Sequence, residues 1–381
     1  MITFQNVTKH YDNGSVVVDG LSLVAPGGKI TVFVGPSGCG KTTSLRMINR
    51  LVEPSSGRIL LNGEATEQMD IVQLRRRIGY VIQNAGLFPH KNIIDNIATT
   101  AILNGAAKSK ARARAGELLE VVGLDPQIAK RFPWQLSGGQ QQRVGVARAL
   151  AADPEFMLMD EPFSAVDPVV REQLQEEFLR IQKEVSKTII MVTHDIDEAM
   201  KLGDLVAVLK PGGKLAQMAS PGELLNTPQN AFVADFIGES NILNGTMVRD
   251  NVVKMYGKEF PCVDGGFAPN EPVDVVIRPE DIDIVPVEQG QLVGTVTNVT
   301  FKGMQYDIIV DFRGFKWLIQ TTDHSPVGAR IGVKIDPDGF HIMKKSEYSG
   351  QFGDYSSYSE EYEELADASL ETDEEEIGDE E

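Results

Sequence analysis

The sequence predicts an α/β layered domain over residues 1–235, a small all-β domain over 240–345 and an acidic tail over 346–381. In the first segment short apolar runs alternate with helical stretches, and the runs include KITVFVG (29–35) and KTIIMVTH (187–194). Nearly continuous apolar strands are typical of a parallel sheet that is covered on both faces. Strands that alternate with helices therefore indicate an α/β fold for this segment.

The second segment contains strand-like stretches with a period of two residues, separated by Gly and Pro clusters. They include VDVVIR (273–278), LVGTVTNVTF (292–301), YDIIVDF (306–312) and KWLIQTT (316–322). This pattern predicts a small β-barrel or a barrel-like domain related to the OB fold.

The third segment holds most of the net negative charge. It contains fifteen Asp or Glu residues and no Lys or Arg, so setting it aside changes the net charge of the chain from −19 to −4. Such a segment cannot bury enough apolar surface to offset the entropy of ordering it, and we expect disorder. A solvated tail that aids solubility is the simpler interpretation, and a regulatory or binding tail is the alternative.

The remaining composition limits the class of protein. No stretch approaches the run of about 18–20 apolar residues that a membrane span needs, and the first residues lack the pattern of a signal peptide. We therefore expect a soluble, cytoplasmic protein whose link to a membrane runs through a partner. Cys39 and Cys262 have no metal-ligand spacing, so both are predicted to be reduced thiols.

The segment GPSGCGKTT (35–43) fits the phosphate-binding pattern G-x-x-x-x-G-K-[ST] between a predicted strand and a predicted helix. Its glycines let the backbone bend into a cradle, and N–H groups at the helix N-terminus then face phosphates. Lys41 would supply a cation to the β- and γ-phosphates, and the Thr42 hydroxyl would ligate Mg²⁺. The predicted nucleotide-binding residues are Gly35, Pro36, Ser37, Gly38, Cys39, Gly40, Lys41, Thr42 and Thr43.

A second motif, FMLMDEP (156–162), places two adjacent carboxylates at the end of a buried strand. Asp160 is expected beside the Mg²⁺ ion. Glu161 is expected on the γ-phosphate side, where it can orient and deprotonate a water molecule.

The third motif, LSGGQQQR (136–143), opens the helical stretch RVGVARALAA. Ser137 is a natural helix cap, and Gly138 and Gly139 leave the N–H groups of the helix N-terminus accessible to a phosphate. Since residues 35–43 already serve the nucleotide of this chain, a second phosphate-binding helix end makes sense if it serves the nucleotide of another copy.

This order of motifs, with a glutamine before LSGGQ and a histidine after the DE pair, resembles the nucleotide-binding domain of the ABC transporter superfamily over residues 1 to about 235. The resemblance implies that Tyr11 stacks on adenine, that Gln83 contacts Mg²⁺ and the attacking water, and that His194 contacts the γ-phosphate. It also implies that Asp167 lies in the loop that crosses between two subunits. Val166 departs mildly from the family pattern at that loop.

The resemblance further implies a head-to-tail pair of copies, each contributing Ser137, Gly138, Gly139 and Gln140 to the ATP held by the other. Residues 84–92 match the surface that receives the coupling helix of a membrane permease. The expected partners are permease subunits and a substrate-binding protein, with no nucleic acid. The expected location is the cytoplasmic face of the membrane.

Two parts of the chain indicate different substrates. VVIRPEDIDI (275–284) and HIMKK (341–345) resemble the TOBE-type domain of importer ATPases, and 230–245 resembles the spermidine/putrescine importers. Residues 44–64 and 75–98 instead resemble the glycine betaine, carnitine and choline importer ATPases, which often carry CBS domains that are not recognisable here. We favour polyamine import, with quaternary amines as the alternative.

A soluble ABC-type ATPase that acts on DNA or ribosomes is a more distant alternative. Such proteins carry long coiled coils or two nucleotide domains in one chain. The stretch between Lys41 and Gln135 has no sustained heptads, and the sequence holds one phosphate-binding motif.

Overall fold

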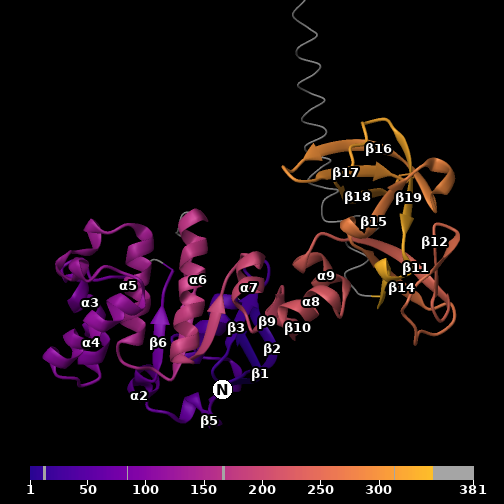
Figure 1. Cartoon of the computed structure of the whole chain (residues 1–381). Helices are drawn as coiled ribbons and strands as arrows, with labels where there is room; N and C mark the ends of the chain where they lie inside the picture. Colours follow the sequence, from indigo (N-terminus) through magenta and orange to yellow (C-terminus); the bar gives the residue numbers. More distant parts are fainter. Residues whose placement is uncertain (12–13, 84, 165–167, 313, 346–381) are drawn as a thin grey trace, which may run out of the picture. The chain divides into compact units, whose positions relative to one another are not determined.

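The computed structural model describes residues 1–11, 14–83, 85–164, 168–312 and 314–345, with side chains left undescribed at 168–170 (Figure 1). The predicted tail over 346–381 lies outside the described residues. The chain divides into two compact units, Met1–Leu224 and the part from Leu225 onward. None of the described helices is long and apolar enough to cross a membrane.

The first unit contains the predicted α/β layer. Its six-stranded sheet has the order β10-β9-β3-β8-β7-β6, in which all neighbours pair in parallel except β9 with β10. Strands β3, β7 and β8 are buried along their whole length, as continuous apolar runs require. The strands are β3 (Ile30–Val34), β6 (Ile78–Val81), β7 (Phe156–Asp160), β8 (Thr188–Val192), β9 (Leu205–Lys210) and β10 (Lys214–Ala219).

A second, antiparallel sheet in this unit has the order β2-β1-β4-β5. One core cluster contains residues of both sheets and of helix α1, and the rings of Phe4 and Phe33 meet edge to face with their centroids 6.0 Å apart. The strands are β1 (Ile2–His10), β2 (Val16–Ala25), β4 (Ser56–Leu61) and β5 (Glu64–Ala65).

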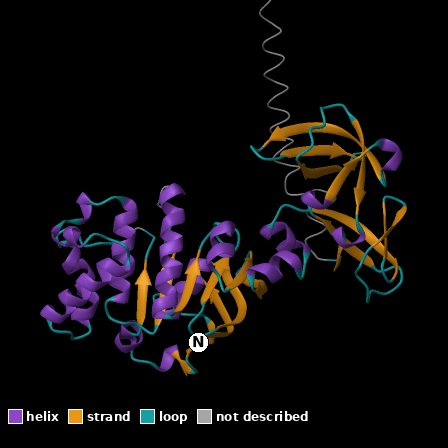
Figure 2. Cartoon of the chain, in the orientation of Figure 1, coloured by secondary structure: helices purple, strands orange, loops and turns teal. Residues whose placement is uncertain are grey.

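Helices α3, α4 and α5 pack against one another at one end of the first unit, beyond edge strand β6 (Figure 2). Asn92 caps α3 by accepting a hydrogen bond from the backbone of Asp95, and Ser137 caps α5. The helices of the unit are α1 (Lys41–Ile48), α2 (Ile71–Arg76), α3 (Ile93–Leu103), α4 (Lys108–Val121), α5 (Gly138–Leu150), α6 (Pro168–Val185), α7 (Ile196–Leu202) and α8 (Pro221–Asn226), which spans the boundary.

The boundary between the units lies earlier in the chain than residue 235. Helix α9 (Ala231–Ile237) buries Ala231 and Ala234 in a cluster with Ile242, Val276 and Met343 of the second unit. This apolar contact explains why α9 belongs to the second unit. From sequence alone, a short helix that follows an α/β pattern is easily assigned to the α/β domain.

The second unit consists of two five-stranded antiparallel sheets, β13-β12-β11-β14-β20 and β15-β19-β16-β17-β18, around one shared core that includes the fully buried Trp317. The strands are β11 (Asn241–Arg249), β12 (Val252–Met255), β13 (Lys258–Pro261), β14 (Pro272–Ile277), β15 (Ile282–Val285), β16 (Leu292–Phe301), β17 (Tyr306–Asp311), β18 (Lys316–Thr321), β19 (Arg330–Ile335) and β20 (His341–Lys344). Short 3₁₀ helices span Thr66–Gln68, Pro126–Lys130, Pro133–Gln135, Pro279–Asp281, Val287–Gln289 and Pro337–Gly339.

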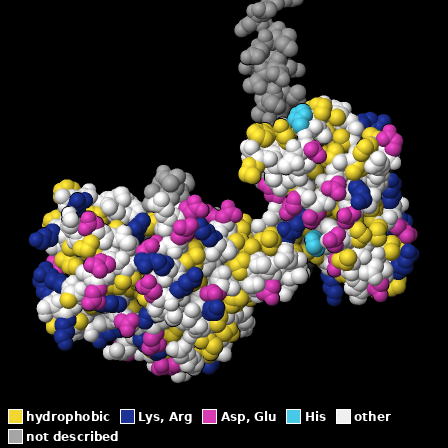
Figure 3. Space-filling view, in the orientation of Figure 1, with side chains coloured by type: hydrophobic (Ala, Val, Ile, Leu, Met, Phe, Trp, Pro, Cys, Tyr) yellow, Lys and Arg dark blue, Asp and Glu magenta, His cyan; other side chains and the backbone are white. Residues whose placement is uncertain are grey.

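The surface of the first unit mixes both signs of charge. On the face shown in Figure 3, Lys and Arg side chains lie beside Asp and Glu side chains, with apolar groups between them. The strong negative charge of the chain is therefore not spread over this face.

Asn241 joins the two sheets of the second unit. Its side-chain amide donates to the carbonyl oxygen of Leu318 (2.9 Å) and to that of Ile277 (3.4 Å), and its Oδ1 accepts the Leu318 N–H (2.8 Å). The residue is 1% exposed, so water cannot replace these partners.

Asn241→Ala is expected to destabilise the second unit by about 2–4 kcal/mol, since each buried backbone group left unpaired costs about 1–3 kcal/mol. Urea unfolding followed by tryptophan emission measures this, because Trp317 is buried whereas Trp134 is already 74% exposed. Asn298→Ala, at a half-buried position of β16, is the control and should change stability by less than about 0.5 kcal/mol. Equal effects of the two substitutions would contradict the bridging role.

Candidate nucleotide-binding site

The loop after β3 has a tightly specified backbone. Gly35 has a φ of +153° and Gly40 a φ of +94°. A Cβ atom on Gly35 would lie 2.3 Å from the carbonyl oxygen of Leu209, and one on Gly40 would lie 2.4 Å from that of Val17. Both positions therefore require glycine, because neighbouring backbone fills the space that any side chain would need.

Helix α1 begins at Lys41, and its N-cap Gly40 provides no side-chain cap. The N–H groups of the first turn are therefore available to an anion. Lys41 is only 7% exposed, and its ammonium donates to the carbonyl oxygens of Gly35 (2.6 Å) and Pro36 (3.0 Å). Burial raises the pKa of the Cys39 thiol, although Lys41 opposes the shift, so Cys39 stays neutral and unreactive.

Asp160 at the end of β7 accepts a hydrogen bond from the Thr42 hydroxyl at 2.8 Å. Its other oxygen lies 3.5 Å from Arg46 and 3.5 Å from the Tyr80 hydroxyl. Burial, followed by the charge of Asp160, raises the pKa of Tyr80. The adjacent hydroxyl and carboxylate oxygens suit Mg²⁺, which commonly takes one or two protein oxygens together with phosphate oxygens.

Glu161 lies next to Asp160 and contacts two further polar side chains. Gln83 donates to Glu161 Oε2 at 3.0 Å, and His194 Nδ1 lies 3.4 Å from the same oxygen. Glu161 has a φ of +46°, and its N–H donates to the carbonyl oxygen of Val192 on β8. The hydrogen bond to β8 holds this left-handed backbone in place.

These groups meet because the carboxyl ends of parallel strands share one edge of the sheet. Lys41, Thr42, Glu161 and His194 border an open cavity of about 560 Å³, whereas Asp160 and Gln83 contact residues of its lining. Its lining residues are Val17, Ser37, Gly38, Cys39, Gly40, Lys41, Thr42, Thr43, Glu161 and His194. The phosphate loop, the Thr42 hydroxyl beside the Asp160 carboxylate, and the Glu161 carboxylate, which can act as a base, thus lie close together.

The LSGGQ segment lies elsewhere on the unit, because none of the described residues that line this cavity comes from α5. Ser137 Oγ accepts the Gln140 N–H at 3.3 Å, and Gln140 Oε1 accepts the Ser137 N–H at 3.1 Å. Ser137 and Gly138 are exposed and Gly139 is buried. The cap was predicted, but the reciprocal bond of Gln140 was not; this bond uses Gln140 Oε1, and the Nε2 amide group keeps its capacity to donate.

Two predicted site residues remain, Tyr11 and Asp167. Tyr11 is 43% exposed, with the ammonium of Lys9 5.3 Å from its ring centroid, and it is not among the residues that line the cavity. Asp167 lies outside the described residues.

Arg46 and Tyr80 were not predicted from the sequence. Arg46 follows Thr42 by four residues on α1, so both side chains lie on one helix face, and this spacing could have indicated the contact with Asp160. Tyr80 is on β6, the strand that leads to Gln83 and pairs with β7, and only the sheet order brings it to Asp160.

The chain is similar to known proteins over most of its length. A family model described as ABC transporter matches residues 18–164, and one described as TOBE domain matches 275–343. The spermidine/putrescine import ATP-binding protein PotA of Desulfitobacterium hafniense (strain Y51) is 42% identical over 345 residues, which cover 91% of this chain and 98% of that protein. Its counterpart from Acetivibrio thermocellus is 42% identical over 347 residues, covering 91% and 97%.

Two solved structures resemble the first unit. The dimeric post-hydrolysis ATP-binding cassette MJ0796, bound to ADP and Pi, aligns with a TM-score of 0.53 and 32% identity over 58% of this chain and 99% of its own. CbiO1 from Clostridium perfringens, part of the ABC transporter complex cbiONQ, aligns with a TM-score of 0.55 and 28% identity over 58% and 89%.

The chain therefore belongs to the ABC transporter family, as an ATP-hydrolysing subunit. Within that family it is of the import type, since its similarity to import ATP-binding proteins extends over most of its length and includes the TOBE domain.

Gly40→Ala is expected to weaken ATP binding at least about tenfold, because the new Cβ would displace the phosphate loop from Val17. Titration with a fluorescent ATP analogue measures this. Gly63→Ala is the matched control, because Gly63 also has a positive φ (+89°) but has open space around its Cβ position. Binding by the Gly40 variant within twofold of the unaltered chain would contradict the steric argument.

Proposed function

We propose that this chain powers the import of polyamines such as spermidine or putrescine by hydrolysing ATP at the carboxyl edge of its parallel sheet. The observation that carries the proposal is the cluster of Gln83, Glu161 and His194 beside Lys41 and Thr42. The relatives that match over most of the chain are spermidine/putrescine import ATP-binding proteins, which supports the substrate class.

The hydrolytic roles follow from the chemistry of each group. The loop 35–40 and the N-terminus of α1 bind the phosphates, and Lys41 supplies a cation that can leave its carbonyl partners for them. Thr42 and Asp160 would hold Mg²⁺, which neutralises charge on the phosphates when bound. Glu161 accepts the proton of the attacking water, while Gln83 and His194 orient the carboxylate and contact the reacting groups.

A second copy completes the site in this proposal. Ser137, Gly138 and Gln140 have accessible surface outside the cavity of their own chain and can meet the ATP of a partner, whereas Gly139 is buried in the single chain. The dimeric cassette among the solved relatives supports such a pair. Tyr11 would contact adenine, and Asp167 would lie at the crossing between the copies.

The predicted coupling surface has a rigid frame. Asn96 is fully buried, accepts the Phe88 N–H at 2.7 Å and donates to the carbonyl oxygens of Phe88 (3.1 Å) and Lys91 (3.0 Å). Phe88 itself is 39% exposed, so an apolar ring is accessible on a loop that the hydrogen bonds of Asn96 hold in place. We propose that a permease docks there and places the chain at the cytoplasmic face of the membrane, with a substrate-binding protein as a further component.

Asp160→Asn is expected to raise the Mg²⁺ concentration needed for half-maximal ATPase activity by about tenfold or more, because one negative oxygen beside Thr42 is lost. Activity is measured against Mg²⁺ at saturating ATP. Asp153→Asn, which alters an exposed carboxylate paired with Lys187, should leave the Mg²⁺ dependence unchanged. An unchanged dependence in the Asp160 variant would remove it from the metal site.

The assay measures transport of labelled spermidine into vesicles that contain the chain, its permease and its binding protein. Transport should stop in the Glu161→Gln variant and persist in Glu155→Gln, a control at an exposed carboxylate. ATP binding should survive in both variants, because Glu161 does not hold the nucleotide. Glycine betaine transport in place of spermidine transport would favour the alternative that the N-terminal half indicates. Spermidine transport by Glu161→Gln at the unaltered rate would contradict the proposed base.

A further inference from the structure

The imidazole of His194 has little side-chain support of its own. The side chain is 60% exposed, and in the described part of the chain its one polar contact joins Nδ1 to Glu161 Oε2 at 3.4 Å. A group that shares or transfers a proton works at about 2.6–3.2 Å, so this separation is close to the useful range but not fixed by a tight bond. The position of the imidazole therefore depends on the backbone that carries it.

That backbone is held on both sides of His194. Thr193 is 2% exposed, and its N–H donates to the carbonyl oxygen of Phe33 on β3 at 3.2 Å. Its hydroxyl oxygen accepts the Asp195 N–H at 3.1 Å, so a hydroxyl-closed turn has His194 at its centre. Asp195 Oδ1 then accepts the Glu198 N–H at 3.0 Å and caps helix α7.

Helix α6 contacts the two carboxylates that follow His194. Arg171 Nη1 lies 3.4 Å from Asp195 Oδ2, and Gln175 Nε2 donates to Glu198 Oε1 at 3.3 Å. Arg171 and Gln175 are four residues apart, so they lie on the same face of α6. This face is therefore joined to the first turn of α7 at two points.

The contact between Gln175 and Glu198 is buried. The two residues are 6% and 4% exposed, so water cannot easily replace either partner. Burial raises the pKa of the Glu198 carboxyl, and hydrogen bonds from Thr193 and Gln175 oppose the shift. A buried carboxyl that loses a donor must find another one, and a shift of the first turn of α7 is the available response.

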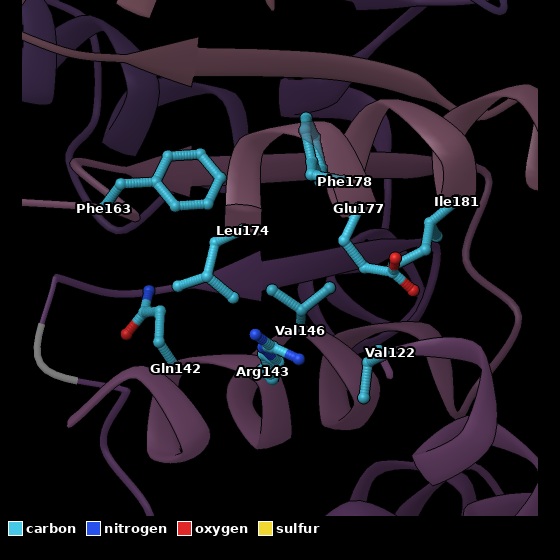
Figure 4. Close-up of a pocket in the computed structure, with 9 residues that line it drawn as sticks. All are labelled: Val122, Gln142, Arg143, Val146, Phe163, Leu174, Glu177, Phe178 and Ile181. Atoms are coloured by element: carbon cyan, nitrogen blue, oxygen red, sulfur yellow. The ribbon is translucent and has the colours of Figure 1, made fainter. Parts of the chain in front are cut away.

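Another face of α6 packs beside the segment that follows Glu161. The rings of Phe163 and Phe178 meet edge to face with their centroids 5.9 Å apart, and both residues are buried. Figure 4 shows Phe163, Leu174 and Phe178 across a small cavity of about 20 Å³ from Val146 of α5. Since Phe163 follows Glu161 by two residues, α6 supports the chain next to the carboxylate as well as the chain next to the imidazole.

We propose that Arg171 and Gln175 are positioning residues for ATP hydrolysis, because they hold the two carboxylates that follow His194. Helix α6 then sets the separation between the imidazole of His194 and the carboxylate of Glu161. Neither Arg171 nor Gln175 lines the cavity. The inference rests on the proposed roles of Glu161 and His194 in hydrolysis.

The test measures ATP hydrolysis in vesicles that contain the full chain with its permease. Gln175→Leu keeps most of the side-chain volume but removes the donor to Glu198. It should lower kcat at least about tenfold, since a displacement of about 1 Å at a reacting group can cost about a hundredfold. Its affinity for ATP, measured in a Glu161→Gln background, should stay within about twofold. Gln173→Leu, at an exposed position of the same helix, is the matched control and should leave kcat unchanged.

A double-mutant cycle with His194→Ala separates positioning from a general structural role. Gln175→Leu should lower kcat by less than about twofold once the imidazole is absent. Asp195→Ser tests the other contact, because serine still caps α7 but brings no charge to Arg171. It should lower kcat at least about threefold, and only when His194 is present, so it carries the test if Gln175→Leu fails to fold.

Losses of kcat that are equal with and without His194 would assign these contacts a structural role only and overturn the inference. Unchanged kcat in both Gln175→Leu and Asp195→Ser would also overturn it. Unaltered turnover by His194→Ala or by Glu161→Gln would instead contradict the proposed function, so the two failures are distinguishable.

Discussion

The hydrogen bond from Gln83 to Glu161 joins the helical part of the first unit to the proposed catalytic carboxylate. Glu161 is fixed on its other side by the bond from its N–H to Val192 on β8, which holds a left-handed backbone. Further along the chain, the carbonyl oxygens of Ala85 and Gly86 accept hydrogen bonds from Arg148 on α5. The proposed catalytic carboxylate is thus held by the parallel sheet through its backbone and by Gln83 through its side chain.

Much of the site could be predicted from sequence because its parts are local. The phosphate loop, the DE pair and the cap at Ser137 each occupy a few consecutive residues whose backbone requirements restrict residue type. Gly35 and Gly40 illustrate this, since adjacent carbonyl oxygens exclude any Cβ. The contact of Asp160 with Tyr80 depends on sheet order and could not be predicted from local sequence, whereas the spacing of Thr42 and Arg46 could have indicated the Arg46 contact. The hydrogen bonds from Arg148 to the carbonyl oxygens of Ala85 and Gly86 also could not be predicted locally, because they form only when α5 lies against residues 85–86.

The fold, like the site, could be predicted where its sequence signals are local and could not be predicted where it depends on long-range pairing. The buried parallel strands were predicted from continuous apolar runs, whereas the antiparallel sheet that starts with β1 was not separated from them. The all-β character of the second unit was predicted, but its division into two sheets joined by Asn241 depends on long-range pairing. The boundary between the units lies before α9, because α9 packs against Ile242 and Val276 of the second unit. The proposed substrate class rests on the similarity of the whole chain to its relatives.

The central claim is that the ATP site is complete only when two copies of this chain come together. The sedimentation of the Glu161→Gln chain, with ATP and with ADP, tests it most directly. The account predicts a dimer with ATP and a monomer with ADP, and it predicts that adding Ser137→Arg keeps the chain monomeric while ATP still binds. A monomer with bound ATP in the Glu161→Gln chain, or a dimer that forms regardless of Ser137→Arg, would contradict the account.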